Sequence, residues 1–260
     1  MLFRGKDLSR MLREWNYDSS KLNVRRIIGE DGREKIQLRV DLGILQMEVD
    51  GRPDGRRPHG RESLLDHYLG ALKAHRKEKG SVTGFVLSKD DCLDLQQEAV
   101  QYYHRYLSLF YLGDFEGVVR DTKRNLKAFD LVKKYADDAS DRQIFEQFRP
   151  FVLMMHTRAK ASMALKEKEF DQAISLINQG ISDIENCSIE DSERGPGGDV
   201  GSEVIFLQRW KDEVSKLKPE EPLEKLQREM DEAVHSENFE LAAELRDKLR
   251  IMQRLDLPEP

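Results

Sequence analysis

The sequence predicts a mainly α-helical protein with a small antiparallel β meander near its N-terminus. Two observations support this fold class. Apolar residues recur at steps of three and four over most of the chain after residue 63, which is the spacing of one helix face. Strand-like composition is confined to residues 23–49, where an Asp-Gly pair between two apolar runs is typical of a hairpin turn.

The composition is that of a chain with many exposed helix faces. Of the 260 residues, 35% are charged and 38% are hydrophobic, and the formal net charge of −6 gives a pI of about 5.7. This negative balance argues against a nucleic-acid-binding surface spread over the whole molecule. No stretch approaches the ~20 apolar residues of a membrane span, and the N-terminus lacks the apolar core of a signal peptide. We therefore expect a cytoplasmic protein.

The N-terminal region is predicted to hold one short helix and then the meander. Four apolar residues share the face of the helix: Leu8, Met11, Leu12 and Trp15. Three short strands are expected to follow it: Asn23 to Ile28, Glu34 to Val40 and Ile44 to Val49. A sheet this small needs neighbouring helices to cover one of its faces.

A stretch rich in arginine, glycine and proline follows the meander, and we expect it to form a loop. Guanidinium groups bind phosphate and carboxylate bidentately, so the arginines of this loop are a candidate anion-binding site. The alternative is that arginine and proline order the turn and cap nearby carbonyl groups. The four candidate residues are Arg52, Arg56, Arg57 and Arg61.

Helix start and stop signals divide the middle of the chain. Ser63 and Ser88 each precede an aspartate by three residues, which is the pattern of a helix N-cap. Gly80 is placed to end the first of these two helices. Pro150 lies inside an apolar helical pattern, so we expect it to kink the helix or to split it near Arg149.

Two stretches of this helical region share one scheme, in which a phenylalanine opens a second helix after a short break. The breaks fall at residues 112–114 and near residues 168–169, and the phenylalanines are Phe115 and Phe170. Both stretches resemble tetratricopeptide-type helix hairpins. The separation of the two phenylalanines exceeds the roughly 34 residues of the standard repeat, so we expect longer helices than that family has.

Two apolar helical runs near the C-terminus, separated by Ser236-Glu237-Asn238, predict a helical hairpin over residues 223–253. Small alanines in the second run allow two backbones to approach closely. Leu241 and Leu245 add apolar side chains to a second face. A hairpin of this length buries too little apolar surface to fold well alone, so we expect the chain's own body, a second copy or a partner to cover it.

The same hairpin resembles the UVR motif of the excision-repair proteins UvrB and UvrC, which also occurs in Clp-type unfoldase ATPases and McsA-like kinase activators. In those families the motif is a protein-docking element without catalytic residues. The resemblance implies docking on a Clp-type ATPase, a UvrB/UvrC-like subunit or a second copy. It assigns this role to Leu226, Met230, Ala233, Phe239, Ala242, Ala243, Arg246, Asp247 and Leu249.

Two of these residues carry specific expectations about the hairpin. Phe239 is expected to anchor the turn between the two helices, because its spacing from Met230 and Leu249 allows it to pack between them. Arg246 is expected to pair with a carboxylate on a partner or in the first helix, since an unpaired arginine on a packed helix face is costly.

The sequence shows no catalytic constellation, and it contains no phosphate loop, nucleophile elbow or His-Glu-x-x-His motif. His67 and His75 are about 12 Å apart along a helix at ~1.5 Å per residue, too far to share one metal ion. Cys92 and Cys187 lack neighbouring cysteines, which excludes a Cys-x-x-Cys zinc site. The glycine-rich residues 187–202, expected to form a flexible loop, do not match a dinucleotide fingerprint. We therefore expect a non-enzymatic protein without metal or cofactor.

These observations favour an adaptor or scaffold, and the resemblance to the UVR motif implies that it acts in protein quality control with a Clp-type ATPase or in a repair complex. Two alternatives use the arginine-rich loop: a nucleic-acid-associated repair factor and an anion-responsive regulator. The expected parts of the chain are an N-terminal region with the helix, meander and loop (1–62), a tetratricopeptide-like helical body (63–218), a linker (219–222), the UVR-like hairpin (223–253) and a tail (254–260).

Overall fold

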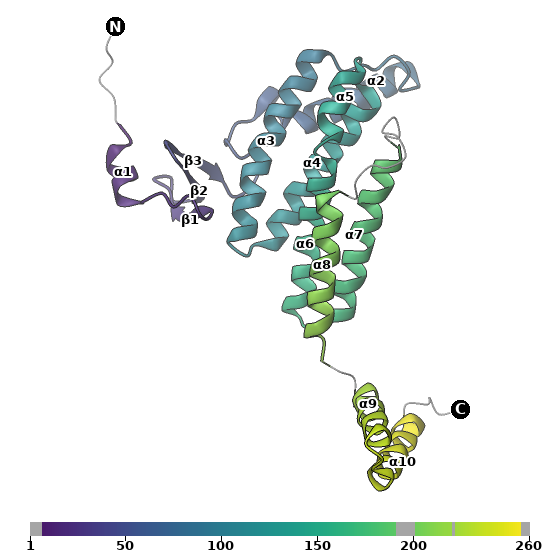
Figure 1. The fold of residues 1–260 in the computed structure, drawn as a ribbon. Coiled ribbons are helices and arrows are strands. Elements are labelled where there is room, and N and C mark those ends of the chain that lie inside the picture. Colours follow the sequence, from purple (N-terminus) through teal and green to yellow (C-terminus); the bar gives the residue numbers. More distant parts are fainter. Residues whose placement is uncertain (1–6, 191–200, 220–221, 256–260) are drawn as a thin grey trace. The chain divides into compact units, whose positions relative to one another are not determined.

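The computed structural model describes residues 7–190, 201–219 and 222–255, and the chain divides into two compact units, Met1–Lys211 and Asp212–Pro260. The predicted fold class, mainly helical with a small antiparallel sheet near the N-terminus, is confirmed (Figure 1). Most of the expected loop at 187–202, half of the linker and most of the tail lie outside the described residues. The division into five parts stays a prediction.

Three strands form one antiparallel sheet in the order β1-β2-β3: β1 (Asn23–Ile28), β2 (Glu34–Val40) and β3 (Gly43–Glu48). The first two strands have the predicted bounds, and the third begins one residue earlier than expected. Gly32 adopts a φ of +74° in the turn between β1 and β2, which is the conformation that the Asp-Gly pair predicted.

The two faces of the sheet differ in chemistry. On one face, Ile36, Leu38 and Met47 are buried, and β2 lies against α3 (Figure 1). On the other face, the register places Gln37 between Arg25 and Gln46, and their side chains are joined by hydrogen bonds of 2.9 Å. Helix α3 therefore covers the apolar face of the sheet, as so small a sheet requires.

The short N-terminal helix is present as α1 (Ser9–Glu14), but it buries none of its residues. Leu8 and Met11, which were expected to form its apolar face, are exposed. Trp15, the residue after the helix, has a defined contact: the guanidinium of Arg25 lies 4.0 Å from its ring centre. A cation–π contact thus connects this segment to the polar face of the sheet.

Helices make up the rest of the chain. A short 3₁₀ helix, η1 (Pro58–Gly60), interrupts the arginine-rich loop. The helices of the body are α2 (Leu64–Lys79), α3 (Lys89–Tyr111), α4 (Phe115–Tyr135), α5 (Ala139–Glu146), α6 (Arg149–Lys166), α7 (Phe170–Glu190) and α8 (Ser202–Leu217).

The predicted start and stop signals are found at the helix ends. Ser63 accepts a hydrogen bond from the amide three residues further on, and Ser88 forms a complete capping box with Asp91. Gly80 ends α2 in the left-handed conformation, with φ of +72°. Pro150 lies in the first turn of α6, so the expected disruption is a split between α5 and α6.

Two helix hairpins, α3/α4 and α6/α7, turn at the predicted breaks, and Phe115 and Phe170 open their second helices. The rings of Phe110 and Phe115 lie 5.3 Å apart across the first turn. In the second hairpin, Gly180 of α7 faces the buried Thr157 of α6 at close range. The helices are paired as expected, and their relation to the tetratricopeptide family stays a prediction.

We predict that Gly180→Ala destabilises the body. A Cβ at this position would lie 2.7 Å from Cβ of Thr157, so the buried helix contact would have to open. Overpacking of this kind costs roughly 1–3 kcal/mol, against a gain of at most ~1 kcal/mol in helix propensity. Urea unfolding monitored by circular dichroism measures the difference.

The matched control is Gly70→Ala in α2, where the nearest atom is 4.0 Å from the added Cβ. This change should be neutral or slightly stabilising. Equal stability of the two variants would contradict the close α6/α7 contact.

Candidate functional site

The C-terminal hairpin consists of α9 (Pro222–His235) and α10 (Phe239–Leu255), as the sequence predicted. Its turn falls at Ser236-Glu237-Asn238, where Glu237 adopts a φ of +56°. The amide of Asn238 donates a 2.8 Å hydrogen bond to the carbonyl of Ala233, and its side chain accepts one from the amide of Leu241. Asn238 therefore closes the first helix and caps the second.

The hairpin has a small apolar core of its own, in which the side chains of the two helices interdigitate. The alanines on the facing stripes allow the close approach that the sequence suggested. The buried residues are Ala233, Ala242, Leu245 and Leu249, with Leu226 and Met230 partly buried against them. Most of the residues that the resemblance assigned to docking are thus required for the fold of the hairpin.

Three of the residues assigned to docking lie on the surface instead. Phe239 is 67% exposed, so the expectation that it anchors the turn is wrong, and Asn238 has that role. Arg246 and Asp247 are both exposed and pair with each other at 3.1 Å. Among the described side chains, Arg246 thus contacts its neighbour on α10 and no carboxylate of α9, because the two helices pack through alanine and leucine.

The structure adds residues that the sequence analysis had not assigned to the site. A hollow in the hairpin surface is lined by Glu229, Glu232, Ala233, Ser236, Leu241 and Leu245. Leu241 is 43% exposed, whereas Leu245 belongs to the core, so the second apolar face of α10 is narrower than expected. The spacing of three and four residues between the two glutamates and the serine is the signal that places them on one face of α9.

Comparison with models of known protein families identifies the hairpin. Residues 220–254 match the UvrB/uvrC motif. The match includes both α9 and α10 and confirms the resemblance noted in the sequence, and we call these two helices with their turn the UVR hairpin. No curated protein and no solved structure matches the chain.

The four arginines of the arginine-rich loop differ in their surroundings. Nε of Arg52 lies 3.1 Å from Oε1 of Glu98, at ion-pair distance although the N–H is not aligned for a hydrogen bond. Arg56, Arg57 and Arg61 are exposed. The candidate anion site therefore stays a prediction for these three residues, while Arg52 is part of the interior.

Glu98 lies in the middle of α3 and is fully buried. Its two oxygens accept hydrogen bonds from the backbone amides of Leu64 and Leu65, at 2.8 and 3.3 Å, in the first turn of α2. Arg52 and Arg124 approach the same carboxylate. A negative charge at a helix N-terminus is stabilising, so this glutamate holds α2 and the loop against α3.

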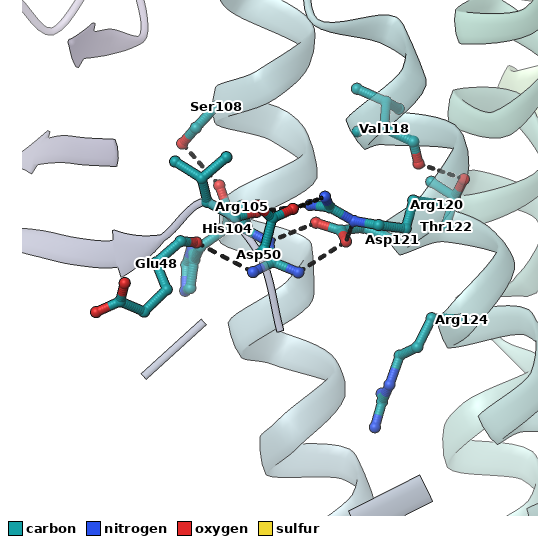
Figure 2. Close-up of polar contacts among 12 residues, drawn as sticks. Glu48, Asp50, His104, Arg105, Ser108, Val118, Arg120, Asp121, Thr122 and Arg124 are labelled. Carbon is teal, nitrogen blue, oxygen red and sulfur yellow. Dashed lines mark hydrogen bonds and ion pairs between the residues drawn. The ribbon is translucent and has the colours of Figure 1, made fainter. Parts of the chain in front are cut away.

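A second buried carboxylate, Asp121 of α4, fastens β3 to the helices (Figure 2). Arg105 donates two hydrogen bonds to it, at 2.7 and 2.8 Å, and a third to the carbonyl of Glu48 at 3.0 Å. Arg120 connects Asp121 to Asp50, at 3.0 and 2.7 Å. Sequence analysis missed this network, because its partners are far apart in the chain.

Other candidate chemistry finds no support among the described residues. Burial raises the pKa of the Cys92 thiol to about 11, so the reactive thiolate is scarce near neutral pH. In the described ranges, no group of three or more histidine, cysteine, aspartate and glutamate side chains is arranged to hold a metal ion. Within these same residues, no helix combines the length and the apolar character that crossing a membrane requires.

We predict that Glu98→Gln lowers the free energy of unfolding by ~3 kcal/mol, because it removes the buried carboxylate that Arg52 and Arg124 both approach, and Arg52 keeps only Asp54 at 3.5 Å. Urea unfolding measures the loss. Hydrogen exchange at the amides of Leu64 and Leu65 should also accelerate relative to the rest of α2.

The control is Asp50→Asn, which removes an exposed carboxylate from the neighbouring Asp121 network and should have little effect. If both variants are equally stable, the structural role of Glu98 is disproved.

Proposed function

We propose that this chain is a non-enzymatic cytoplasmic adaptor that docks on a partner protein through its UVR hairpin. The observation that carries the proposal is the exposure of Phe239 on a hairpin whose own core is already complete. Leu241 is exposed beside the hollow on the same hairpin. Exposed apolar side chains that the local fold does not need are typical of contact residues.

The class of partner comes from the motif. Its description connects it with UvrB and UvrC, and the resemblance extends to Clp-type ATPases and McsA-like activators. We therefore propose a Clp-type ATPase in protein quality control, or a UvrB/UvrC-like subunit of a repair complex, as the docking partner.

The proposal that the chain is not an enzyme is supported by the way its buried carboxylates are used. Both oxygens of Asp121 accept hydrogen bonds from arginine side chains. Both oxygens of Glu98 are likewise taken up by backbone amides and arginines. A carboxylate with this set of contacts has no free oxygen for a substrate proton, so it serves the fold and not general acid–base chemistry.

We predict that the double variant Phe239→Ser, Leu241→Ser loses its partner while the hairpin stays folded. Central aromatic and aliphatic anchors contribute ~2 kcal/mol or more to an interface, so binding should weaken at least about tenfold. The measurement is retrieval of cross-linked partners from the native lysate by the tagged full-length chain, quantified by mass spectrometry. Circular dichroism checks that helix content is unchanged.

Two controls make this experiment decisive. Ile251→Ser changes another exposed apolar residue of α10, and it should leave partner retrieval unchanged. A chain that ends at Leu217 lacks the hairpin, and it should lose the same partners as the double variant. Identical partners for the full and the shortened chain would refute docking through the hairpin.

A second candidate function, a nucleic-acid-associated repair factor or an anion-responsive regulator, rests on the exposed Arg56, Arg57 and Arg61. It requires binding of DNA, RNA or phosphate that weakens as salt is raised and is lost when these arginines become alanine. The net charge of −6 makes it the less favoured proposal.

A further inference from the structure

Helix α3 presents an apolar stripe whose side chains stay partly exposed. Leu93, Val100, Tyr103 and Tyr111 are between 36% and 49% exposed, although all four are large apolar or aromatic side chains. Their spacing places them on one side of the helix. The opposite side of α3 packs on α4 and on the sheet, so the stripe is not required for either contact.

The stripe continues onto two further helices of the same unit. The ring of Phe151, from α6, lies 6.1 Å from that of Tyr103. Phe206, in α8, is 40% exposed and shares the guanidinium of Arg158 with Phe110 of α3. Scattered exposed apolar residues are common on protein surfaces, but aromatic side chains gathered from three helices mark an interaction surface. We call this surface the α3–α6–α8 face.

A single guanidinium group joins the three helices of this face. Cζ of Arg158, in α6, lies 4.4 Å from the ring centre of Phe110 in α3 and 4.7 Å from that of Phe206 in α8. Its Nη1 also lies 3.7 Å from Sδ of Met155. Contacts with two rings fix the side chain, while leaving hydrogen-bond donors at the rim of the guanidinium without an oxygen acceptor in the described ranges.

Arg158 differs in this respect from other arginines in the interior. Arg105 contacts Asp121, and Arg149 contacts Glu146 at 2.7 Å. Within the part of the chain that the structure describes, no carboxylate forms an ion pair with Arg158. Burial lowers the pKa of Arg158, and no neighbouring acid opposes this effect. A desolvated cation without a counter-charge is energetically unfavourable, so an incoming carboxylate would be stabilising.

We propose that the α3–α6–α8 face binds an acidic, amphipathic segment of a partner protein, whose carboxylate pairs with Arg158. Guanidinium and carboxylate groups match in a planar, bidentate geometry, and the two phenylalanine rings already hold the guanidinium in place. Apolar side chains of the same segment would cover Tyr103 and Phe151. The positive charge of Arg158, which no acid of the described residues pairs with, argues for a partner segment that carries a carboxylate at this point.

This proposal is independent of docking by the UVR hairpin, because the face lies within the first unit. The test uses the full-length chain and two pools of short fluorescent peptides with matched apolar content. One pool carries glutamate, and the other carries glutamine at the same positions. Fluorescence anisotropy should show that the glutamate pool binds about tenfold more tightly, which is the effect of ~1.4 kcal/mol from one charge-assisted contact.

The variant Arg158→Met keeps a long apolar side chain between the two rings, and it should reduce binding of the glutamate pool to the level of the glutamine pool. Arg158→Lys keeps the charge without the planar fork and should retain part of the preference. Arg76→Met, which removes an exposed arginine of α2, is the matched control and should change nothing. Circular dichroism confirms that each variant is folded.

Three results would overturn the proposal. The first is equal binding of the two pools, or no binding of either pool. The second is a folded Arg158→Met variant that still prefers the glutamate pool. The third is self-association of the chain in analytical ultracentrifugation that Tyr103→Ser abolishes, because the face would then belong to a second copy.

Discussion

Burying a carboxylate costs free energy unless its oxygens are fully paired, and the first unit depends on two carboxylates that meet this condition. Glu98 holds the start of α2 and the arginine-rich loop, and Asp121 holds the end of β3 through Arg105. The three-stranded sheet is too small to be stable alone. Ion pairs of fixed geometry, added to its apolar face, therefore determine where the sheet and the loop lie on the helices.

The requirement that a buried charge be paired also bears on Arg158. Where a buried arginine meets a carboxylate of its own chain, as Arg105 and Arg149 do, the charge is neutralised and the contact serves the fold. Arg158 is held by the rings of Phe110 and Phe206, which stabilise a cation without neutralising it. A surface that holds a partly buried cation with no ion-pair partner among the described residues favours carboxylates over cations, which an apolar surface alone does not.

Local signals in the sequence predicted the elements that local interactions determine. The caps at Ser63 and Ser88, the Asp-Gly turn and the split before Pro150 each depend on residues within a few positions of one another. The buried networks did not follow from the sequence, because Glu98 meets residues more than thirty positions away. Nothing near Glu98 in the sequence distinguishes it from the other charged residues of α3, and only the packing of α2 against it shows its role.

In the UVR hairpin, too, the sequence predicted the local elements but not the environment of each side chain. The motif predicted two helices and their turn correctly, because Ala233 and Ala242 must be small for the helices to approach. It did not separate residues that build the hairpin from exposed residues: Ala233 and Ala242 lie in the core, whereas Phe239, which was also expected to anchor the turn, is 67% exposed. Because the alanines lie in the core, we propose that a partner is recognised through Phe239, Leu241 and the glutamates around the hollow. The match to the motif thus accounts for the fold of the hairpin, while the proposed docking depends on side chains that the alanine-rich core leaves exposed.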